Sequence, residues 1–169
     1  MTELPYRPCV GIMLLNGMNE VFVGQRKGGP ETEGELYTWQ MPQGGIDKGE
    51  EPLVCARREL YEETNIKSAK LLAEIPDWLS YDLPPGLSGK AWKGKYRGQT
   101  QKWFLMRFIG DEGEIDVAHP AGGHKPEFVA WKWVEIAALP DLIVPFKREV
   151  YEKIVLFAQK HVAASNAPA

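Results

Sequence analysis

The sequence of 169 residues contains few cysteines, no long apolar run and no excess of positive charge. Its two cysteines, Cys9 and Cys55, lie inside apolar stretches without metal-ligand spacing, so we expect buried, reduced thiols and no disulfide. No apolar run approaches the ~20 residues of a membrane span, and the first residues lack the basic and apolar regions of a signal peptide. We therefore expect a cytoplasmic protein that does not contact a membrane.

The balance of charges narrows the class of ligand. Lys and Arg number 20 and Asp and Glu number 23, a formal net charge of −3, so no overall positive field draws the chain to DNA or to an anionic membrane. A polyanionic ligand must therefore be held by a local cluster of basic side chains. With 44% hydrophobic and 25% charged residues, the chain can bury a core. Its length fits one domain over residues 1–162, followed by a disordered tail at 163–169.

Alternating apolar and turn-forming segments predict one layered α/β or α+β domain. The expected strands cover residues 7–15, 21–26, 69–81, 100–109 and 128–134, and the expected helices begin at Pro52 and Pro145. The first two strands are separated by a turn at 16–19 and should form a hairpin. The strand at 69–81 is interrupted near Pro76. The first helix should end at Asn65, a residue suited to a C-terminal cap.

Three glutamates are expected on one face of the first helix. Glu59, Glu62 and Glu63 stand at i, i+3 and i+4, which places them within one arc of about 100°. Carboxylates on neighbouring turns repel one another, and a bound cation would offset that repulsion. A shell of oxygen atoms suits the hard cations Mg²⁺ and Mn²⁺. The alternative is a solvated acidic face balanced by Arg57 and Arg58.

A glycine-rich loop leads into this helix, and such a loop lets the backbone approach a phosphate or a metal closely. The chain has Gly44, five residues, Glu50, seven residues, and then the run 58–66, which reads Arg-Glu-Leu-Tyr-Glu-Glu-Thr-Asn-Ile. This spacing resembles the box of the Nudix hydrolase superfamily, G-x5-E-x7-R-E-U-x-E-E-x-G-U, in which U is a bulky aliphatic residue. One position differs, because Asn65 stands where the box has its last glycine. Asparagine tolerates the left-handed conformation, so the end of the helix is preserved.

The resemblance implies both a fold and a reaction. The fold is a mixed β-sheet between helices, and the reaction is hydrolysis of a phosphoanhydride bond in a nucleoside diphosphate that is linked to another group. The implied ligands of Mg²⁺, for which Mn²⁺ or another divalent cation can substitute, are the carbonyl of Gly44 and the carboxylates of Glu59, Glu62 and Glu63. By the same resemblance, Arg58 orients carboxylates, and Glu50 joins the loop to the helix by hydrogen bonding. We favour Glu59 as the base that takes a proton from the attacking water.

Segments outside the box resemble one clade of this superfamily, and together they span roughly residues 6–151. They are 6–12, 39–46, 101–105, 126–128, 131–133 and 146–151. The clade contains the bacterial RNA 5′ pyrophosphohydrolases and the asymmetric dinucleoside polyphosphate hydrolases, and in it Glu127 corresponds to an additional metal-site glutamate. Without the resemblance, Glu127 would be an ordinary loop residue.

Three functions are compatible with this resemblance. The first is an RNA pyrophosphohydrolase that removes pyrophosphate from the 5′-triphosphate end of RNA and so promotes transcript decay. The second keeps the chemistry but acts on diadenosine tetraphosphate and related dinucleoside polyphosphates. The third is a catalytically inactive module that binds nucleotide or RNA, which is disfavoured because all four glutamates of the implied metal site are present.

Basic and aromatic residues are the candidates for substrate binding. Arg7, Arg26 and Lys27 suit phosphate, since guanidinium groups pair with it in a bidentate way, although they would also serve as solvated charges at strand ends. Gln43 is a further candidate. Phe146 stands at the start of the last helix, and its position in the clade implies stacking on the first base of the substrate. Core packing is the alternative for this ring.

The segment 83–110 is rich in positive charge. It contains six basic residues, including Lys90, Lys93 and Lys95, no acidic residue, and the aromatic residues Trp92, Tyr96 and Trp103. Basic charge interleaved with aromatic rings suits a single-stranded polyanion with stackable bases. We place Lys95 among the substrate contacts, and a solvated loop is the alternative. Trp92 and Tyr81 are the alternatives to Phe146 for base recognition.

Overall fold

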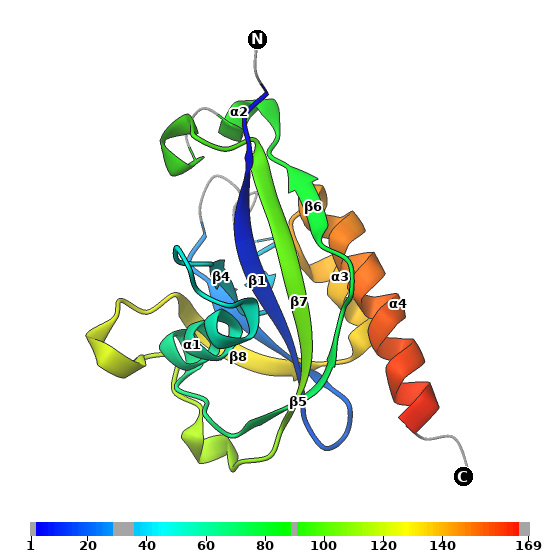
Figure 1. Ribbon diagram of the computed structural model, residues 1–169. Helices are drawn as coiled ribbons and strands as arrows, with labels where there is room; N and C mark the ends of the chain where they lie inside the picture. The colour runs from blue at the N-terminus through cyan, green and yellow to red at the C-terminus, as the bar shows by residue number, and fades with distance from the viewer. Residues whose placement is uncertain (1–2, 29–35, 89–90, 166–169) are drawn as a thin grey trace.

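The computed structural model describes residues 3–28, 36–88 and 91–165, so Lys90 and residues 166–169 of the expected tail lie outside the described residues. The described strands form one mixed sheet of eight strands (Figure 1). In chain order they are β1 (Tyr6–Leu15), β2 (Val21–Arg26), β3 (Trp39–Gln40), β4 (Gln43–Gly45), β5 (Ala69–Glu74), β6 (Leu79–Asp82), β7 (Gly98–Phe108) and β8 (Phe128–Val134). The helices are α1 (Pro52–Thr64), α2 (Pro85–Ser88), α3 (Leu139–Leu142) and α4 (Arg148–Ser165), and the 3₁₀ turns include η2 (Ala91–Gly94), η4 (Ala121–Gly123) and η6 (Pro145–Lys147).

Strands β1 and β7 form the centre of the sheet (Figure 1). They run parallel in a continuous register from Tyr6 opposite Gly98 to Leu15 opposite Arg107. The other pairs are antiparallel: β2 and β4 pair with β1, β3 and β8 with β2, and β5 and β6 with β7. Strand β1 therefore lies between β4 and β7, which brings three distant parts of the sequence side by side. The mixed sheet and the first hairpin are confirmed.

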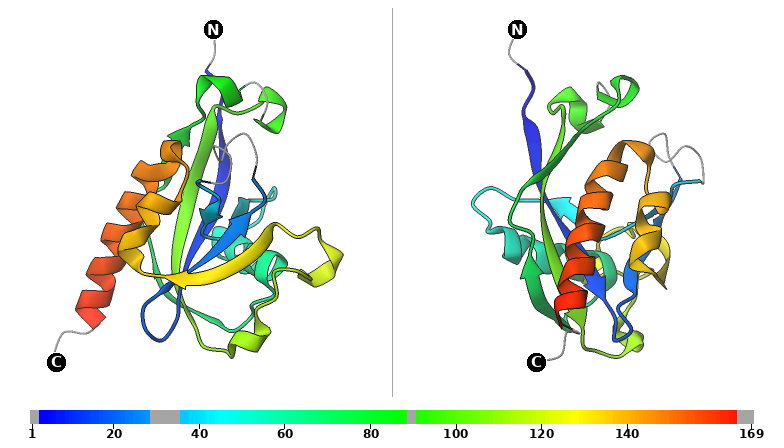
Figure 2. Two further views of the ribbon diagram at one scale, coloured as in Figure 1. Left: turned by 180° about the vertical axis from the view of Figure 1, so that it is seen from behind. Right: turned by 90° about the vertical axis from the view of Figure 1, so that its right-hand side faces the viewer.

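Helices cover both faces of the sheet, with α1 on one face and α3 and α4 on the other (Figures 1 and 2). On the first face, Val10 and Ile12 of β1 pack in one core cluster with Leu60 of α1. On the second face, Met13 packs in another cluster with Ile154 of α4. Successive residues of a strand point to opposite faces, so a strand buried on both sides needs the nearly continuous apolar run that β1 has.

Helix α1 has the ends that its sequence predicts. Pro52 occupies the first turn, where a missing N–H costs no helical hydrogen bond. Cys55 and Leu60 are buried against the sheet. At the other end Asn65 takes a left-handed φ of 67°, and its N–H donates to the Tyr61 carbonyl at 2.8 Å. The expected cap at Asn65 is confirmed.

Three segments contain more structure than the sequence predicts. The residues on either side of Pro76 form two separate strands, β5 and β6, which both pair with β7. The stretch 83–98, which lies between two of the expected strands, contains α2 and η2. The last helix opens with the 3₁₀ turn η6, and α4 then continues to Ser165, into the segment expected to be a tail. Helix α4 extends this far because Val162 still packs against the core.

The two cysteines are buried and unpaired, as predicted for Cys9 and Cys55. In the part of the chain that the structure describes, no helix is both long enough and apolar enough to cross a bilayer.

Candidate active site

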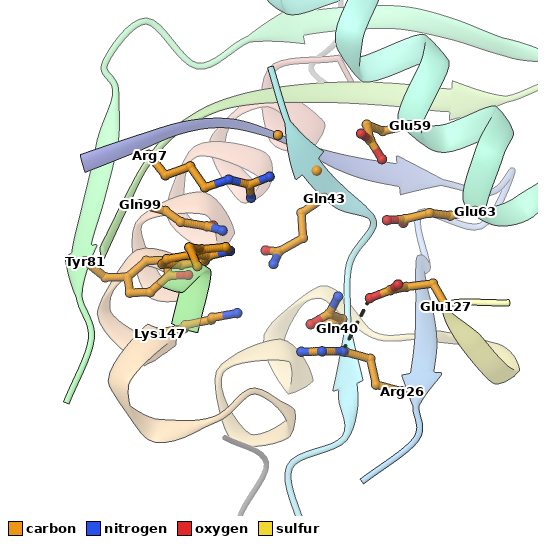
Figure 3. Close-up of a pocket in the computed structure, with 13 residues that line it drawn as sticks. Arg7, Arg26, Gln40, Gln43, Glu59, Glu63, Tyr81, Gln99, Glu127 and Lys147 are labelled. Atoms are coloured by element: carbon orange, nitrogen blue, oxygen red, sulfur yellow. Dashed lines mark ion pairs between the residues drawn. The ribbon is translucent and has the colours of Figure 1, made fainter. Parts of the chain in front are cut away.

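A cavity of about 330 Å³ opens beside β4, and residues from many segments of the fold, from β1 to η6, contribute to its wall (Figure 3). Carboxylates face it from one side, namely those of Glu59, Glu63 and Glu127. Cations and an amide face it from the other side, namely Arg7, Gln99 and Lys147. Gln43 of β4 stands between the two groups. The cavity therefore joins an acidic half to a half that is rich in hydrogen-bond donors.

Two glycines of β4 let charged side chains approach the strand closely. A Cβ at Gly44 would meet the Glu59 carboxylate, and a Cβ at Gly45 would meet the guanidinium of Arg7. Successive residues of a strand face opposite sides of the sheet, so Glu59 and Arg7 lie across β4 from each other. A side chain at either glycine would displace a charged group from the cavity.

Arg58 ties the loop before α1 to the carboxylates on the helix. Its Nε and Nη2 donate to the two carboxylate oxygens of Glu50 at 2.8 and 2.9 Å, a bidentate pair. Its Nη1 donates to Glu59 and to Glu62, both at 3.0 Å, and its Nη2 also reaches the Gly45 carbonyl at 3.2 Å. One guanidinium therefore fixes the loop, the end of β4 and two helix carboxylates relative to one another.

These contacts also determine the charge states of Glu50 and Arg58. Hydrogen bonding from Arg58 lowers the pKa of the Glu50 carboxyl from its ordinary 4.5 to about 2, although desolvation acts in the opposite direction. The same bond raises the pKa of the Arg58 guanidinium. Both groups are therefore charged at neutral pH.

Glu63 is buried beside other carboxylates. Only 8% of the residue is exposed, and its Oε2 has no hydrogen-bond partner among the described residues. Burial, and then repulsion from Glu59 and Glu127, raises the pKa of the Glu63 carboxyl well above its ordinary value. Burial also raises the pKa of Glu59, against the lowering effect of Arg58. A cation beside these carboxylates would offset both their desolvation and their repulsion.

The donor atoms fit a hard divalent cation. Glu59, Glu63 and Glu127 line the cavity together with Gly44, and the atoms that they offer as metal ligands are all oxygens. Glu62 does not line it, because Arg58 holds its carboxylate and His124 Nε2 lies 3.7 Å from its other oxygen. Over the described ranges, no three acidic, histidine or cysteine side chains come close enough to enclose an ion. The fit therefore rests on the type of donor and on the unpartnered Oε2 of Glu63.

Most of the residues singled out in the sequence line the cavity: Arg7, Arg26, Gln43, Gly44, Glu59, Glu63 and Glu127. Arg26 and Glu127 form an ion pair at 3.6 Å across the edge of the acidic half (Figure 3). Lys27 and Lys95 are exposed and do not contribute to the wall. Lys27 lies just after the end of β2. In the segment around η2, Trp92 lines the cavity. The strongly hydrated ammonium of Lys95, just after η2, stays in solvent.

Phe146 lies beside the cavity and outside its lining. Its ring is half-buried against the core and lies 5.7 Å from the ring of Tyr81. The two rings border a second hollow of about 260 Å³, and Tyr81 also lines the first cavity. The Lys147 ammonium lies 5.4 Å from the Tyr81 ring and 5.8 Å from the Phe146 ring, within the range of a cation–π contact.

The sequence candidates do not include three of the side chains that line the cavity, those of Gln40, Gln99 and Lys147. Gln99 reaches it through the parallel register of β1 and β7, which places it opposite Arg7. Lys147 reaches it from η6, with only 4% of the residue exposed. For Gln40 and Lys147, the available signal was their place inside the segments 39–46 and 146–151.

Comparison with known proteins decides the family. A family model of the NUDIX domain matches residues 5–154. The chain belongs to the NUDIX family. An RNA pyrophosphohydrolase of Rhodopseudomonas palustris strain BisB18 is 59% identical over 153 residues, which cover 90% of this chain and 87% of that protein. An RNA pyrophosphohydrolase of Azorhizobium caulinodans is 59% identical over 155 residues, which cover 91% of this chain and 92% of that protein.

Solved structures share the NUDIX fold at low sequence identity. The E. coli dihydroneopterin triphosphate pyrophosphohydrolase has a TM-score of 0.64 at 19% identity, covering 90% of this chain and 98% of that one. The C. elegans Ap4A hydrolase in a binary complex has a TM-score of 0.59 at 20% identity, covering 93% and 96%. These likenesses establish the fold alone. NUDIX hydrolases generally use divalent cations, which agrees with the acidic half of the cavity.

Proposed function

We propose that this chain removes pyrophosphate from the 5′-triphosphate end of RNA with the help of a divalent cation, Mg²⁺ first of all. The observation that carries the proposal is a single cavity in which carboxylates face cationic and amide side chains. A polyphosphate needs both, because its oxygens bind cations and also accept hydrogen bonds from the protein. The choice of RNA is supported by relatives named RNA pyrophosphohydrolase that match nearly the whole length of both chains. The product, a 5′-monophosphate end, would expose the transcript to decay.

In this proposal the two halves of the cavity have different tasks. Arg7 and Arg26 bind phosphate oxygens, and Gln43 binds substrate between the halves. Glu59 takes the proton from the attacking water, since its carboxylate lies against Gly44 at the edge of the cavity. Arg58 holds Glu59 in place by a hydrogen bond of 3.0 Å, and Glu50 in turn fixes Arg58. Arg58 and Glu50 therefore act as positioning residues.

The cation would be held by the acidic half. Glu59, Glu63 and Glu127 would bind it together with the carbonyl of Gly44, and Glu62 would join them once released from Arg58. When bound, it supplies charge neutralisation on the phosphate oxygens and a lowered pKa for a water molecule. The carboxylates of the chain hold the cation and accept the proton.

A direct competition tests the substrate. The protein is given 5′-triphosphorylated RNA and diadenosine tetraphosphate at equal concentration with Mg²⁺, and the products are resolved over time. We expect the RNA to be consumed first, with release of pyrophosphate. Faster cleavage of the dinucleotide, with ATP as one product, would assign the chain to the dinucleoside polyphosphate hydrolases. The absence of Mg²⁺-dependent turnover of either substrate would identify an inactive binding module.

A further inference from the structure

A tryptophan and three glutamines form a chain of hydrogen bonds that ends at the cavity. The indole Nε1 of Trp103 donates to Gln101 Oε1 at 2.9 Å. Gln101 Nε2 donates to Gln99 Oε1 at 2.8 Å and to Gln43 Oε1 at 3.3 Å. Gln99 and Gln43 line the cavity, whereas Gln101 and Trp103 are buried behind them.

The direction of this chain follows from the chemistry of its first member. An indole nitrogen can only donate, so Gln101 turns its oxygen toward Trp103 and its nitrogen away from it. That nitrogen can also only donate, so Gln99 and Gln43 must offer it their oxygens. The amide nitrogens of Gln99 and Gln43 are then left for the cavity, and Figure 3 shows both side chains directed into it.

Small residues on β1 make room for these hydrogen-bonded side chains. Gln43 of β4 and Gln101 of β7 flank β1 from its two edges, where they stand opposite Gly11 and Cys9. A Cβ at Gly11 would meet the Trp103 ring, so this ring lies across the strand at the glycine. Amides from two strands can therefore meet above the strand that separates them.

The donor that sets the direction is itself held in place. The Trp103 ring is fully buried and packs edge-on against Tyr151, with ring centroids 5.9 Å apart. The Tyr151 hydroxyl accepts a hydrogen bond from the Met41 backbone N–H at 3.0 Å, two residues before Gln43. A flip of the Gln101 amide would leave the buried indole N–H without an acceptor, which costs free energy.

We propose that Trp103 and Gln101 are positioning residues that turn the amide nitrogens of Gln43 and Gln99 into the cavity, where they donate to non-bridging phosphate oxygens. Gln99 lies in the half of the cavity that also holds Arg7, and Gln43 stands between the two halves. The inference rests on the proposed function, because it describes how the polyphosphate part of that substrate is held.

Two substitutions interrupt this series of hydrogen bonds without removing a residue that lines the cavity. Trp103→Phe deletes the N–H and keeps an aromatic ring in the core, so the donor that sets the orientation of the Gln101 amide is lost. Gln101→Glu keeps the size of the side chain, and its carboxylate can accept from Trp103 but cannot donate to Gln99 or Gln43. The matched control is Trp133→Phe, since the Trp133 indole donates to Glu112 at 2.7 Å outside the cavity lining.

Binding of inorganic tripolyphosphate to the intact protein, measured by calorimetry in metal-free buffer, reports on the phosphate contacts alone. We expect Kd to rise about tenfold in Trp103→Phe and about 100-fold in Gln101→Glu, as the loss of one or two hydrogen bonds to an anion predicts. Trp133→Phe should stay within about twofold of the wild type. With 5′-triphosphorylated RNA and Mg²⁺, KM should rise by similar factors while kcat stays within about threefold.

A double-mutant cycle separates positioning from a loss of core packing. In a background with Gln43→Ala and Gln99→Ala, Trp103→Phe should change the Kd for tripolyphosphate by less than about twofold, because the groups that it orients are gone. If Trp103→Phe does not melt cooperatively, Gln101→Glu takes its place in the cycle.

Four results would overturn the proposal: no tripolyphosphate binding by the wild type, an unchanged Kd in both variants, an equal loss in Trp133→Phe, or additive effects in the cycle. A wild type that binds tripolyphosphate with the expected variant effects and does not cleave RNA would overturn the proposed function and leave the positioning role standing.

Discussion

Glu63 is a buried carboxyl group whose negative form the described residues compensate only in part. Its carboxylate is buried, one of its oxygens has no hydrogen-bond partner among those residues, and Glu59 and Glu127 repel it. Burying an unpaired carboxylate lowers the stability of the folded state. A bound cation would offset this cost, so cation binding and folding stability are linked at this residue.

Replacing Glu63 by Gln should separate the two effects. Without metal, Glu63→Gln should raise the melting temperature, because a neutral amide costs less to bury. With Mg²⁺, kcat should fall about 30- to 1000-fold, or ~2–4 kcal/mol, and the increase in melting temperature that Mg²⁺ gives the wild type should disappear. Thermal scans and product formation measure these effects, and Glu149→Gln is the control because the Glu149 side chain is exposed on α4. Activity within about threefold of the wild type would remove Glu63 from the metal site.

Phe146 is half-buried and packs on Tyr81, so its substitution tests recognition and packing together. If the ring stacks on a base, Phe146→Ala should weaken binding by ~1–3 kcal/mol and raise KM for RNA more than it lowers kcat. A fully buried ring would instead cost ~3–5 kcal/mol of stability. KM, kcat and the melting temperature are measured.

The control for this ring is Phe157→Ala. Phe157 is also half-buried against the same core cluster but, unlike Phe146, does not border the hollow next to the cavity, so its loss should lower the melting temperature and leave KM unchanged. A large fall in melting temperature with a normal KM in Phe146→Ala would limit Phe146 to packing. Base recognition would then move to Tyr81 or Trp92.

At the scale of elements, the loop before α1 and the helix itself behave as one unit. Glu50 receives the bidentate pair from Arg58 and also accepts the Asp47 N–H at 3.1 Å, so one carboxylate joins a loop turn to the helix. The pKa of Glu50 is lowered from 4.5 to about 2 in the folded protein. Its stabilising effect is therefore complete above about pH 4.5 and is lost as the pH falls toward 2.

Glu50→Gln should lower the free energy of unfolding by about 1–3 kcal/mol at pH 7, since it weakens hydrogen bonds to a charged partner. The difference from the wild type should shrink as the pH falls from 4.5 toward 2, because the carboxyl of the unfolded chain takes up its proton near pH 4.5, whereas that of the folded protein does so only near pH 2. Denaturant unfolding at several pH values measures this difference. Glu51→Gln is the control, because the exposed Glu51 makes no capping hydrogen bond. A difference that stays constant with pH would contradict the linkage.

Elements with a strong local pattern were predictable from the sequence. Strand β8 covers the expected residues, and α1 ends at the expected cap, because both depend on side-chain spacing and on one left-handed residue. The three-residue β4 and the parallel pairing of β1 with β7 were not predictable. Tyr6 and Gly98 meet only through tertiary packing, and no local pattern encodes that contact.

Some residues of the candidate site were likewise predictable from local sequence patterns, and others were not. Helical spacing brings Glu59 and Glu63 to the cavity, as the box predicts, but it does not predict that Arg58 draws Glu62 away. Gln99 and Lys147 depend on strand register and on the start of the last helix, so the sequence alone did not single them out.

On the scale of the whole molecule, positive charge is unevenly distributed. The chain has a net charge of −3, yet the segment 83–110 has six basic residues and no acidic one. Lys93 and Lys95 are exposed next to Trp92, which lines the cavity. RNA bound by its 5′ end would bring further phosphates to this segment, whereas a dinucleotide offers none beyond the reacting group.

Replacing Lys93 and Lys95 by Ala should therefore weaken the binding of RNA more than the binding of diadenosine tetraphosphate. We expect the slope of log KM for RNA against log salt concentration to fall by about 0.7 for each phosphate contact that is lost. Steady-state kinetics at several salt concentrations measure it. Lys153→Ala with Lys160→Ala, on exposed positions of α4, is the control. An equal loss for both substrates would indicate a structural role for the segment.

The wall of the cavity is drawn from residues as far apart as Arg7 and Lys147. During synthesis β1 leaves the ribosome before β7, and it cannot pair with β7 until Gly98, the partner of Tyr6, has been added. Contacts between such distant parts of a chain form late in folding. A nascent polypeptide therefore carries the glutamates of α1 long before it carries Lys147, so the wall of the cavity cannot be complete until η6 has been synthesised.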